Sequence, residues 1–337
     1  SVGGLLLGTG FLLLGISLGA TLLAQWTFGI SNVLVLCGLS ALAITVATGN
    51  LFAGLLSGVI DQPALAAALP GLAPHHAAAG ALGWMTMTAM GVSYRLFAMF
   101  MLAPEAKGGS RGFLIAALCA LAGLYLSFGS GLLGSRAAAA VEAFAIVGAL
   151  AVLGYYLHDI WRMFTARRRK VLELNSAAGL AALGFLVPGA VMLAGAAFID
   201  TELPLGIAAF YILGLGWLTG LGLAQLYKIV PFLTWLETYG AVMGRVQVPR
   251  VQDLVDEAHA RLWFGVFYLS VLGGAAAIVV DSDALFRVAS WCQCAAVAAL
   301  VLELVRARRL VYAPEQLRLP PGVTRPHLIY AMTDSKE

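Results

Sequence analysis

The sequence predicts an all-α polytopic membrane protein, a bundle of about nine transmembrane helices, from its apolar composition, its division into spans and its alternating loop charges. Hydrophobic residues make up 61% of the 337 residues and charged residues only 11%. Soluble domains carry about 25% charged residues, so a water-soluble fold is excluded. The net charge of +3 is small, and the basic residues flank apolar segments. The lipid bilayer is therefore the expected partner, and nucleic acid is not.

The apolar segments have the length that a membrane requires. About 20 apolar residues in a helix cross roughly 30 Å of hydrocarbon. Nine segments of this kind are predicted: 3–24, 32–57, 75–103, 112–133, 138–162, 176–199, 204–236, 258–280 and 284–305. The segment 58–74 contains Asp61 and three prolines, so we expect a re-entrant or surface loop there, and ten spans if it crosses after all. We expect one bundle over 1–310 and a cytoplasmic C-terminal tail over 311–337.

The charges between the spans predict the orientation, because Lys and Arg are retained on the cytoplasmic side. Every second loop is basic, and the residues concerned are Lys107, Arg111, Arg162, Arg167, Arg168, Arg169, Lys170, Arg245, Arg250, Arg306, Arg308 and Arg309. The opposite loops hold Asp200, Glu202, Asp281, Asp283 and single arginines. The N-terminus is therefore expected outside and the C-terminus in the cytoplasm, with the inner (plasma) membrane of a bacterium as the expected location.

Two spans share an internal repeat. Gly-Trp-Met-Thr at 83–86 and Tyr-Arg at 94–95 recur as Gly-Trp-Leu-Thr at 216–219 and Tyr-Lys at 227–228, always 133 residues later. Both copies, the repeat helices 75–103 and 204–236, run in the same direction and lie four spans apart, which predicts parallel four-helix repeats. Gly83 and Gly216 would allow close approach of neighbouring helices.

Arg95 and Lys228 are the least expected members of the repeat, because a cation at mid-bilayer costs a few kcal/mol. One interpretation is that both side chains snorkel to the headgroups past Tyr94 and Tyr227. The other is a polar cavity that holds a cofactor carboxylate, a quinone headgroup or a proton path. Glu142, the acidic residue that we note inside a span, is a proton-relay candidate by default.

Three stretches carry a resemblance to a known family: His76 to Trp84, Gly-Val-Ser-Tyr-Arg-Leu-Phe at 91–97, and Leu-Tyr-Lys-Ile-Val-Pro-Phe-Leu-Thr-Trp at 226–235. They resemble the haem-copper oxidase subunit I superfamily, and more narrowly its shortened subunit-I-like members and the nitric-oxide-responsive haem membrane proteins. The resemblance covers the third to the seventh span. It implies four-helix repeats and haem b held by histidines near the outer face, with copper on three further histidines in catalytic members.

The histidines restrict what this resemblance can mean. There are five, at His75, His76, His158, His259 and His327, and only the first two fall on the predicted outer side. The position that matches His76 in the second repeat is Ala209. Copper is therefore not expected, and the chain is not expected to be catalytic alone.

His76 is the best candidate for a haem or metal ligand, with His75 as its competitor. The second axial ligand would be Met85 or Met192, a residue of a missing span, or a partner subunit. An interfacial helix start is the competing interpretation of the His-His pair. For His158 and His259 a salt-bridged interface is preferred to a bis-His haem.

The sequence thus favours a non-catalytic or single-haem-b, oxidase-subunit-I-like membrane subunit of a respiratory or electron-transfer complex, in contact with other subunits. A secondary transporter with a cationic site at Arg95 and Lys228 is the first alternative. A purely structural anchoring or assembly subunit is the second.

Overall fold

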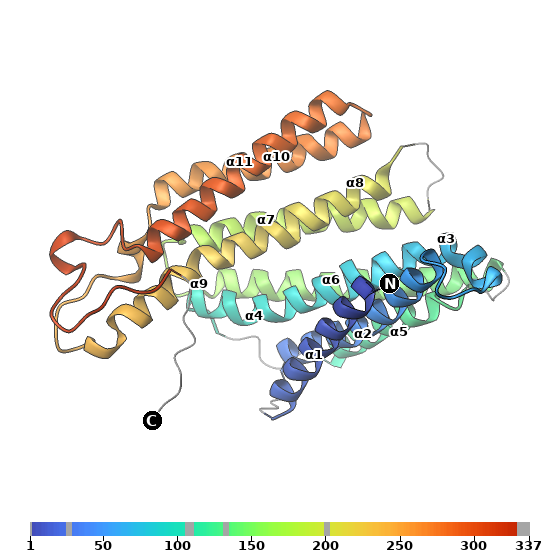
Figure 1. Ribbon diagram of the computed structural model, residues 1–337, viewed down its shortest axis with the longest axis horizontal. Helices are drawn as coiled ribbons and strands as arrows, with labels where there is room; N and C mark the ends of the chain where they lie inside the picture. The colour runs from blue at the N-terminus through green and yellow to red at the C-terminus, as the bar shows by residue number, and fades with distance from the viewer. Residues whose placement is uncertain (1, 25–28, 105–110, 131–134, 199–202, 329–337) are drawn as a thin grey trace. The chain divides into compact units, whose positions relative to one another are not determined.

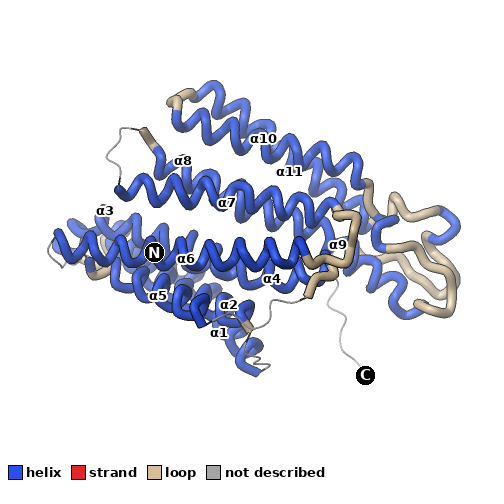
Figure 2. The backbone as a smooth tube through the Cα atoms, turned by 180° about the vertical axis from the view of Figure 1, so that it is seen from behind, coloured by secondary structure: helices blue, strands red, loops and turns tan. Residues whose placement is uncertain are grey.

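The protein is described here by a computed structural model that covers residues 2–24, 29–104, 111–130, 135–198 and 203–328. These residues form an all-α structure (Figure 2). Among the described residues, seven helices are long and apolar enough to cross a membrane. The chain is therefore an integral membrane protein by architecture. The loop residues Lys107, Asp200 and Glu202 lie outside the described residues.

The helices belong to two compact units, residues 1–171 and 172–337. Unit 1 contains α1 (Val2–Ala24), α2 (Ile30–Leu56), α3 (Pro63–Ala78), the π-helix η1 (Ala79–Thr86), α4 (Met87–Met101), α5 (Arg111–Ser127) and α6 (Ser135–Thr165) (Figure 1). Within it α2 packs against α1, η1 and α4, and α5 packs along α6.

Unit 2 contains α7 (Leu174–Phe198), α8 (Leu205–Tyr211), the π-helix η3 (Ile212–Thr219), α9 (Gly220–Tyr239), α10 (Glu257–Val279) and α11 (Asp283–Arg308), with short 3-10 turns η4 (Gly240–Val242), η5 (Val251–Leu254) and η6 (Glu315–Leu317). Within it α7 packs against α8, η3 and α9, and α10 packs along α11. Each unit therefore pairs a long helix, α2 or α7, with a π-interrupted helix, and the last two helices of each unit pack as a hairpin.

Every predicted span falls on helix in its described residues. Of the segment 58–74, which was predicted as a loop, only residues 58–62 are outside a helix, and the prediction is wrong from Pro63 on. The helix α3 begins at Pro63 and continues through η1 into α4. Proline is tolerated at the first helical position, where its missing N–H would have no partner anyway. Alanine, the best helix former, fills much of the next two turns. As a result, α3 continues past two further prolines, Pro70 and Pro74, which lie inside the helix.

The two π-helices occupy matching places in the repeat. Both the first and the last residue of η3 lie 133 residues after those of η1. In each, a threonine hydroxyl donates to the carbonyl five residues earlier: Thr86 to Ala81 at 2.8 Å and Thr219 to Gly214 at 2.9 Å. Extended π-helical turns are rare and are frequent at functional sites.

The glycines of the repeat allow close packing, as the sequence predicted. A Cβ added at Gly83 would lie 2.7 Å from the Ala41 Cβ of α2 and from Leu124 of α5. A Cβ added at Gly216 would collide with the Phe185 side chain of α7. Neither position has room for a larger residue without a shift of its neighbours.

Residues 310–328 fold back onto the end of α9. Tyr239, Leu254, Leu310 and Ala313 form a buried cluster there. The Tyr239 hydroxyl donates to the Arg318 carbonyl at 2.8 Å. The first part of the predicted tail is thus packed against unit 2, while residues 329–337 lie outside the described residues.

A hydrogen-bonded pair closes the turn η5. The Arg250 guanidinium donates to Asp253 Oδ1 at 2.9 Å, and the Arg250 backbone N–H donates to Oδ2 at 2.8 Å. The side-chain hydrogen bond from Arg250 holds the pKa of the Asp253 carboxyl below its ordinary value. A depressed carboxyl pKa adds stability above the unfolded-state value, about 3.9, and this stability is lost as the pH falls through the lower folded-state value.

Asp253→Ala is therefore expected to lower the thermal midpoint of the purified protein at pH 7 and to have a much smaller effect near pH 3. The effect at pH 7 should be modest, because the Arg250 side chain is 79% exposed and water screens such pairs. Midpoints of both proteins across this pH range check the prediction. A difference that stays constant down to pH 3 would contradict it.

Candidate functional site

His76 is held against α2 in unit 1. Its Nδ1 lies 2.8 Å from Thr48 Oγ1, and its ring centroid lies 5.2 Å from that of Phe52. A Cβ added at Gly49 would lie 3.2 Å from His76 Cε1 and 3.9 Å from Nε2. These three residues lie close together along α2. Thr48 orients the imidazole, Gly49 leaves space beside it, and Phe52 packs on it.

The hydrogen bonds of Thr48 favour one tautomer of the His76 imidazole. The Thr48 hydroxyl donates to the Ile44 carbonyl at 2.8 Å, one turn earlier in α2, as threonine does within helices. Its single proton is then used, and the oxygen accepts from His76 Nδ1–H. Nε2 is left with its lone pair and, among the described residues, has no hydrogen-bond partner. This is the tautomer that ligates a metal, with the other nitrogen anchored by a neighbouring group.

The ligand candidates within unit 1, His75 and Met85, are separated from this nitrogen. His75 points to a different neighbour, Phe128, with the ring centroids 5.8 Å apart. Met85 lies nine residues after His76 on the same helical run, a rise of roughly 13 Å. Met85 therefore does not fit as the opposite ligand of an iron held by His76. Met192 belongs to unit 2.

Tyr94 braces the helices of unit 1. Its hydroxyl donates to Asp159 Oδ2 at 3.1 Å, and its ring lies edge-on to Tyr156 at 5.3 Å. The Tyr156 hydroxyl in turn lies 2.7 Å from Ser93 Oγ. The neighbouring Arg95 is exposed, which favours the snorkelling interpretation for this cation.

Lys228, at the matching position of the repeat, has a different environment. Its Nζ lies 2.7 Å from Glu173 Oε2, and the two side chains are only 15% and 11% exposed. The other carboxylate oxygen of Glu173 accepts from Gln252 Nε2 at 2.8 Å. Lys228 is thus neutralised within unit 2 and does not snorkel, contrary to the interpretation shared with Arg95.

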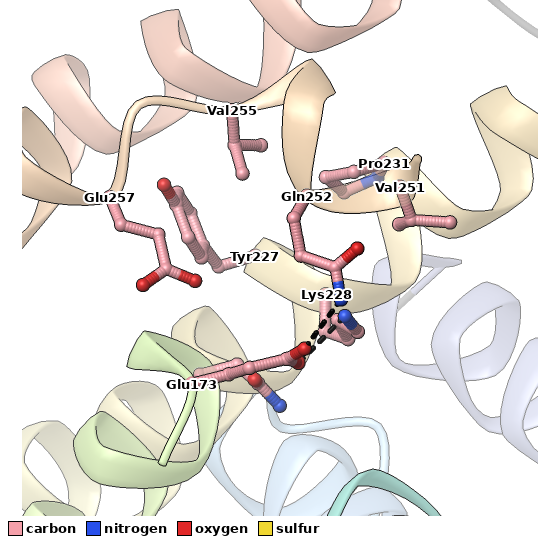
Figure 3. A pocket seen from close by; sticks show the side chains of 9 residues that line it. Glu173, Tyr227, Lys228, Pro231, Val251, Gln252, Val255 and Glu257 are labelled. Carbon is pink, nitrogen blue, oxygen red and sulfur yellow. Dashed lines mark hydrogen bonds and ion pairs between the residues drawn. The ribbon is translucent and has the colours of Figure 1, made fainter. Parts of the chain in front are cut away.

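The Lys228 pair borders a pocket at one end of unit 2 (Figure 3). The pocket has room for about one water molecule and is lined by residues of α7, α9, α10 and the segment before α10: Glu173, Asn175, Tyr227, Lys228, Pro231, Val251, Gln252, Val255 and Glu257. Tyr227 stands in it with Glu257 on one side and Gln252, Lys228 and Glu173 on the other.

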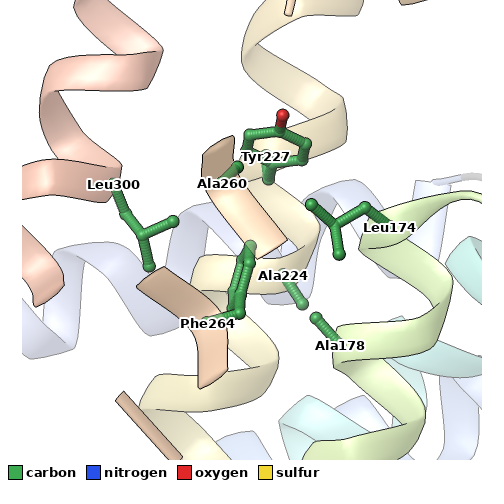
Figure 4. Packing of buried hydrophobic residues seen from close by; sticks show 7 residues of the cluster. All are labelled: Leu174, Ala178, Ala224, Tyr227, Ala260, Phe264 and Leu300. Carbon is green, nitrogen blue, oxygen red and sulfur yellow. The ribbon is translucent and has the colours of Figure 1, made fainter. Parts of the chain in front are cut away.

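A buried apolar cluster fixes the helices beneath this pocket. It joins α7, α9, α10 and α11 (Figure 4) and consists of Leu174, Ala178, Ala224, Tyr227, Ala260, Phe264 and Leu300. The Phe264 ring meets the Tyr227 ring edge-on at 5.9 Å. Such edge-to-face pairs add about 0.5–1.5 kcal/mol to the burial of the rings, so Tyr227 is held rigidly in the pocket wall.

A fully buried carboxylate of unit 2 was not predicted from the sequence. Glu303, in α11, is 0% exposed and accepts from His259 Nδ1 at 2.8 Å, from Arg306 at 2.7 Å and from the Tyr312 hydroxyl at 2.8 Å. His259 is thus hydrogen-bonded to an acid, Glu303, as an interface residue would be. Glu142, the acid that the sequence analysis selected, is exposed on α6.

Glu173 and Asn175 were missed for another reason. They stand at the start of α7, far from Lys228 along the chain, and no spacing links them to it. A signal for Glu303 was available, because it interrupts an apolar stretch one turn before Arg306.

In the part of the chain that the structure describes, no three His, Cys, Asp or Glu side chains are grouped to hold a metal ion. Comparisons with protein-family models, with curated proteins and with solved structures found no match to this chain.

Proposed function

We propose that this chain is a membrane subunit of a respiratory-type redox complex, that it holds one haem b through His76, and that it has no haem-copper centre of its own. The observation that carries the proposal is the Thr48–His76 hydrogen bond, because it anchors Nδ1 and favours the tautomer in which Nε2 is unprotonated. A bound haem b would supply one-electron transfer. Thr48 would hold the ring orientation, Gly49 would keep the approach open, and Phe52 would exclude water from the ligand.

The second axial position is proposed to lie on a partner subunit or on a further segment. Met85 cannot reach it, and His75 is directed elsewhere. This arrangement agrees with a subunit that works within a larger complex. It also agrees with a five-coordinate haem when the chain is purified alone.

The matching π-helices support an origin in four-helix repeats of the oxidase type. They recur at the 133-residue offset of the sequence motif, and each is packed on a long helix of its unit, α2 or α7. An approximately nine-span bundle with such repeats is the architecture we propose around the haem.

The transporter alternative is less well supported. Its two cations are not equivalent, since Lys228 is neutralised by Glu173 and Arg95 is exposed in unit 1. The purely anchoring alternative does not explain why Thr48 orients the His76 imidazole.

The test is a dithionite-reduced minus oxidised optical spectrum of the detergent-purified protein with whatever co-purifies, together with pyridine haemochrome and copper assays. We expect b-type absorbance at about one haem per chain and no stoichiometric copper. A protein free of haem, purified from cells with ample haem supply, would rule out the proposal in favour of an anchoring subunit or a transporter.

A further inference from the structure

The pocket beside Lys228 contains buried polar groups that have no partner in the described part of the chain. Asn175 is 2% exposed, and neither its side-chain oxygen nor its nitrogen has a hydrogen-bond partner among the described residues. The Tyr227 hydroxyl, on a residue that is 4% exposed, also lacks one. Each buried polar group without a partner costs about 1–3 kcal/mol. Unsatisfied groups that converge on one cavity indicate that the cavity holds something.

The charge of the pocket lining is also unbalanced. Two carboxylates, Glu173 and Glu257, and one ammonium, Lys228, line it. Glu173 and Lys228 neutralise each other at 2.7 Å. The carboxylate of Glu257, on the other side of Tyr227 (Figure 3), has no ion pair among the described residues. Glu257 is partly exposed at the start of α10, and the lining as a whole carries one net negative charge.

We infer that this pocket, built by Asn175, Tyr227 and Glu257 beside the Glu173–Lys228 pair, binds one monovalent cation of the size of sodium. A single positive charge would make the lining neutral, whereas a divalent ion would leave one excess positive charge. Amide, hydroxyl and carboxylate oxygens are the ligands that hard cations prefer. A cavity with room for about one water molecule suits a dehydrated alkali ion.

A water molecule or a proton would satisfy only part of this arrangement. Water would provide hydrogen bonds to Asn175 and Tyr227 but would leave Glu257 uncompensated. A proton on Glu257 would remove the charge but would leave the Asn175 side chain and the Tyr227 hydroxyl without partners. A sodium ion compensates the charge and takes the amide and hydroxyl oxygens as ligands. This site lies in unit 2, so it does not depend on the haem proposed at His76 in unit 1.

The inference is tested by equilibrium binding of radioactive sodium ion to the full-length protein in detergent, measured in choline chloride at constant ionic strength. We expect saturable binding at about one ion per chain. Glu257→Gln removes the unpaired charge, and Asn175→Leu removes the amide at similar size. Each variant should weaken sodium binding about tenfold or more, in line with the loss of a charge-assisted ligand in a poorly hydrated site.

Glu315→Gln is the matched control, because it removes one exposed carboxylate of unit 2 that does not line the pocket. It should bind sodium like the wild type. Size-exclusion profiles show which variants are folded, and Glu257→Gln decides the test if Asn175→Leu is not. Absence of saturable sodium binding by the wild type, or wild-type binding by the folded pocket variants, would overturn the inference. Binding that follows the anion and requires Lys228 would overturn it as well.

Discussion

His76→Ala is expected to abolish the b-type absorbance of the purified protein. The imidazole Nε2 is the only atom of the His76–Thr48 pair with a free lone pair suited to iron, so its removal takes away the ligand rather than weakening it. The variant should fold, because His76 is only partly buried. The measurement is the haem-to-protein ratio by pyridine haemochrome after purification in parallel with the wild type.

Two further variants, His75→Ala and Thr48→Val, distinguish a haem ligand at His76 from a His-His pair that only begins a helix at the membrane surface. His75 is the adjacent imidazole on the same helix and should leave the haem content unchanged. Thr48→Val keeps the branched shape but removes the acceptor of Nδ1–H. Loss of such a supporting hydrogen bond typically costs about 10–100-fold in metal affinity, so the variant should lose haem on dilution. Full haem retention by His76→Ala, or its loss in His75→Ala, would show that the ligand is misassigned.

The membrane-spanning part of the fold was accessible from the sequence because its signal is local. Twenty apolar residues between polar breaks predict a helix without knowledge of its neighbours. The prolines between 58 and 74 misled the prediction, since Pro63 starts α3 and does not break it. The π-helices could not be predicted either, because the shared Gly-Trp and Thr positions mark the repeat but do not specify the five-residue hydrogen bonds of Thr86 and Thr219.

For the candidate sites too, the sequence predicts what is local and misses what depends on contacts between helices. His76 stands out as one of few histidines, so the sequence could select it, but its tautomer depends on Thr48 in another helix. Lys228 was selected as a cation in a span, yet its chemistry is set by Glu173 at the start of α7. Partners that come from different helices leave no periodic trace in the sequence. Residue type therefore identified the candidates, and only tertiary contacts show whether each is free to act.

The helical hairpin of α5 and α6 should be the most sensitive part of unit 1 to a single methyl group. A Cβ added at Gly148 would lie 2.8 Å from the backbone nitrogen and 3.0 Å from the Cα of Ala120. A Cβ added at Gly123 would lie 2.6 Å from the Cα of Ala145. Backbone atoms cannot rotate away as side chains do, so the two helices must separate to accept either methyl group.

We expect Gly148→Ala to lower the free energy of unfolding by about 1–3 kcal/mol or more, which is the usual cost of overpacking. Adding Gly123→Ala should lower it further, with an effect that is not the sum of the two because both residues lie at one interface. Unfolding in dodecyl sulfate, followed by circular dichroism of detergent-solubilised protein, provides the measurement.

Gly154→Ala tests whether close packing, and not helix propensity, causes the loss. Gly154 lies on the same helix, α6, and a Cβ added there would meet nothing within 4 Å. Replacing a glycine inside a helix by alanine normally stabilises it by roughly 0.5–1 kcal/mol. The two substitutions in α6 should therefore have opposite signs, although the chemical change is identical. If Gly148→Ala were as stabilising as Gly154→Ala, α5 and α6 would not be in backbone contact at Gly148, and the hairpin of unit 1 would have to be packed differently.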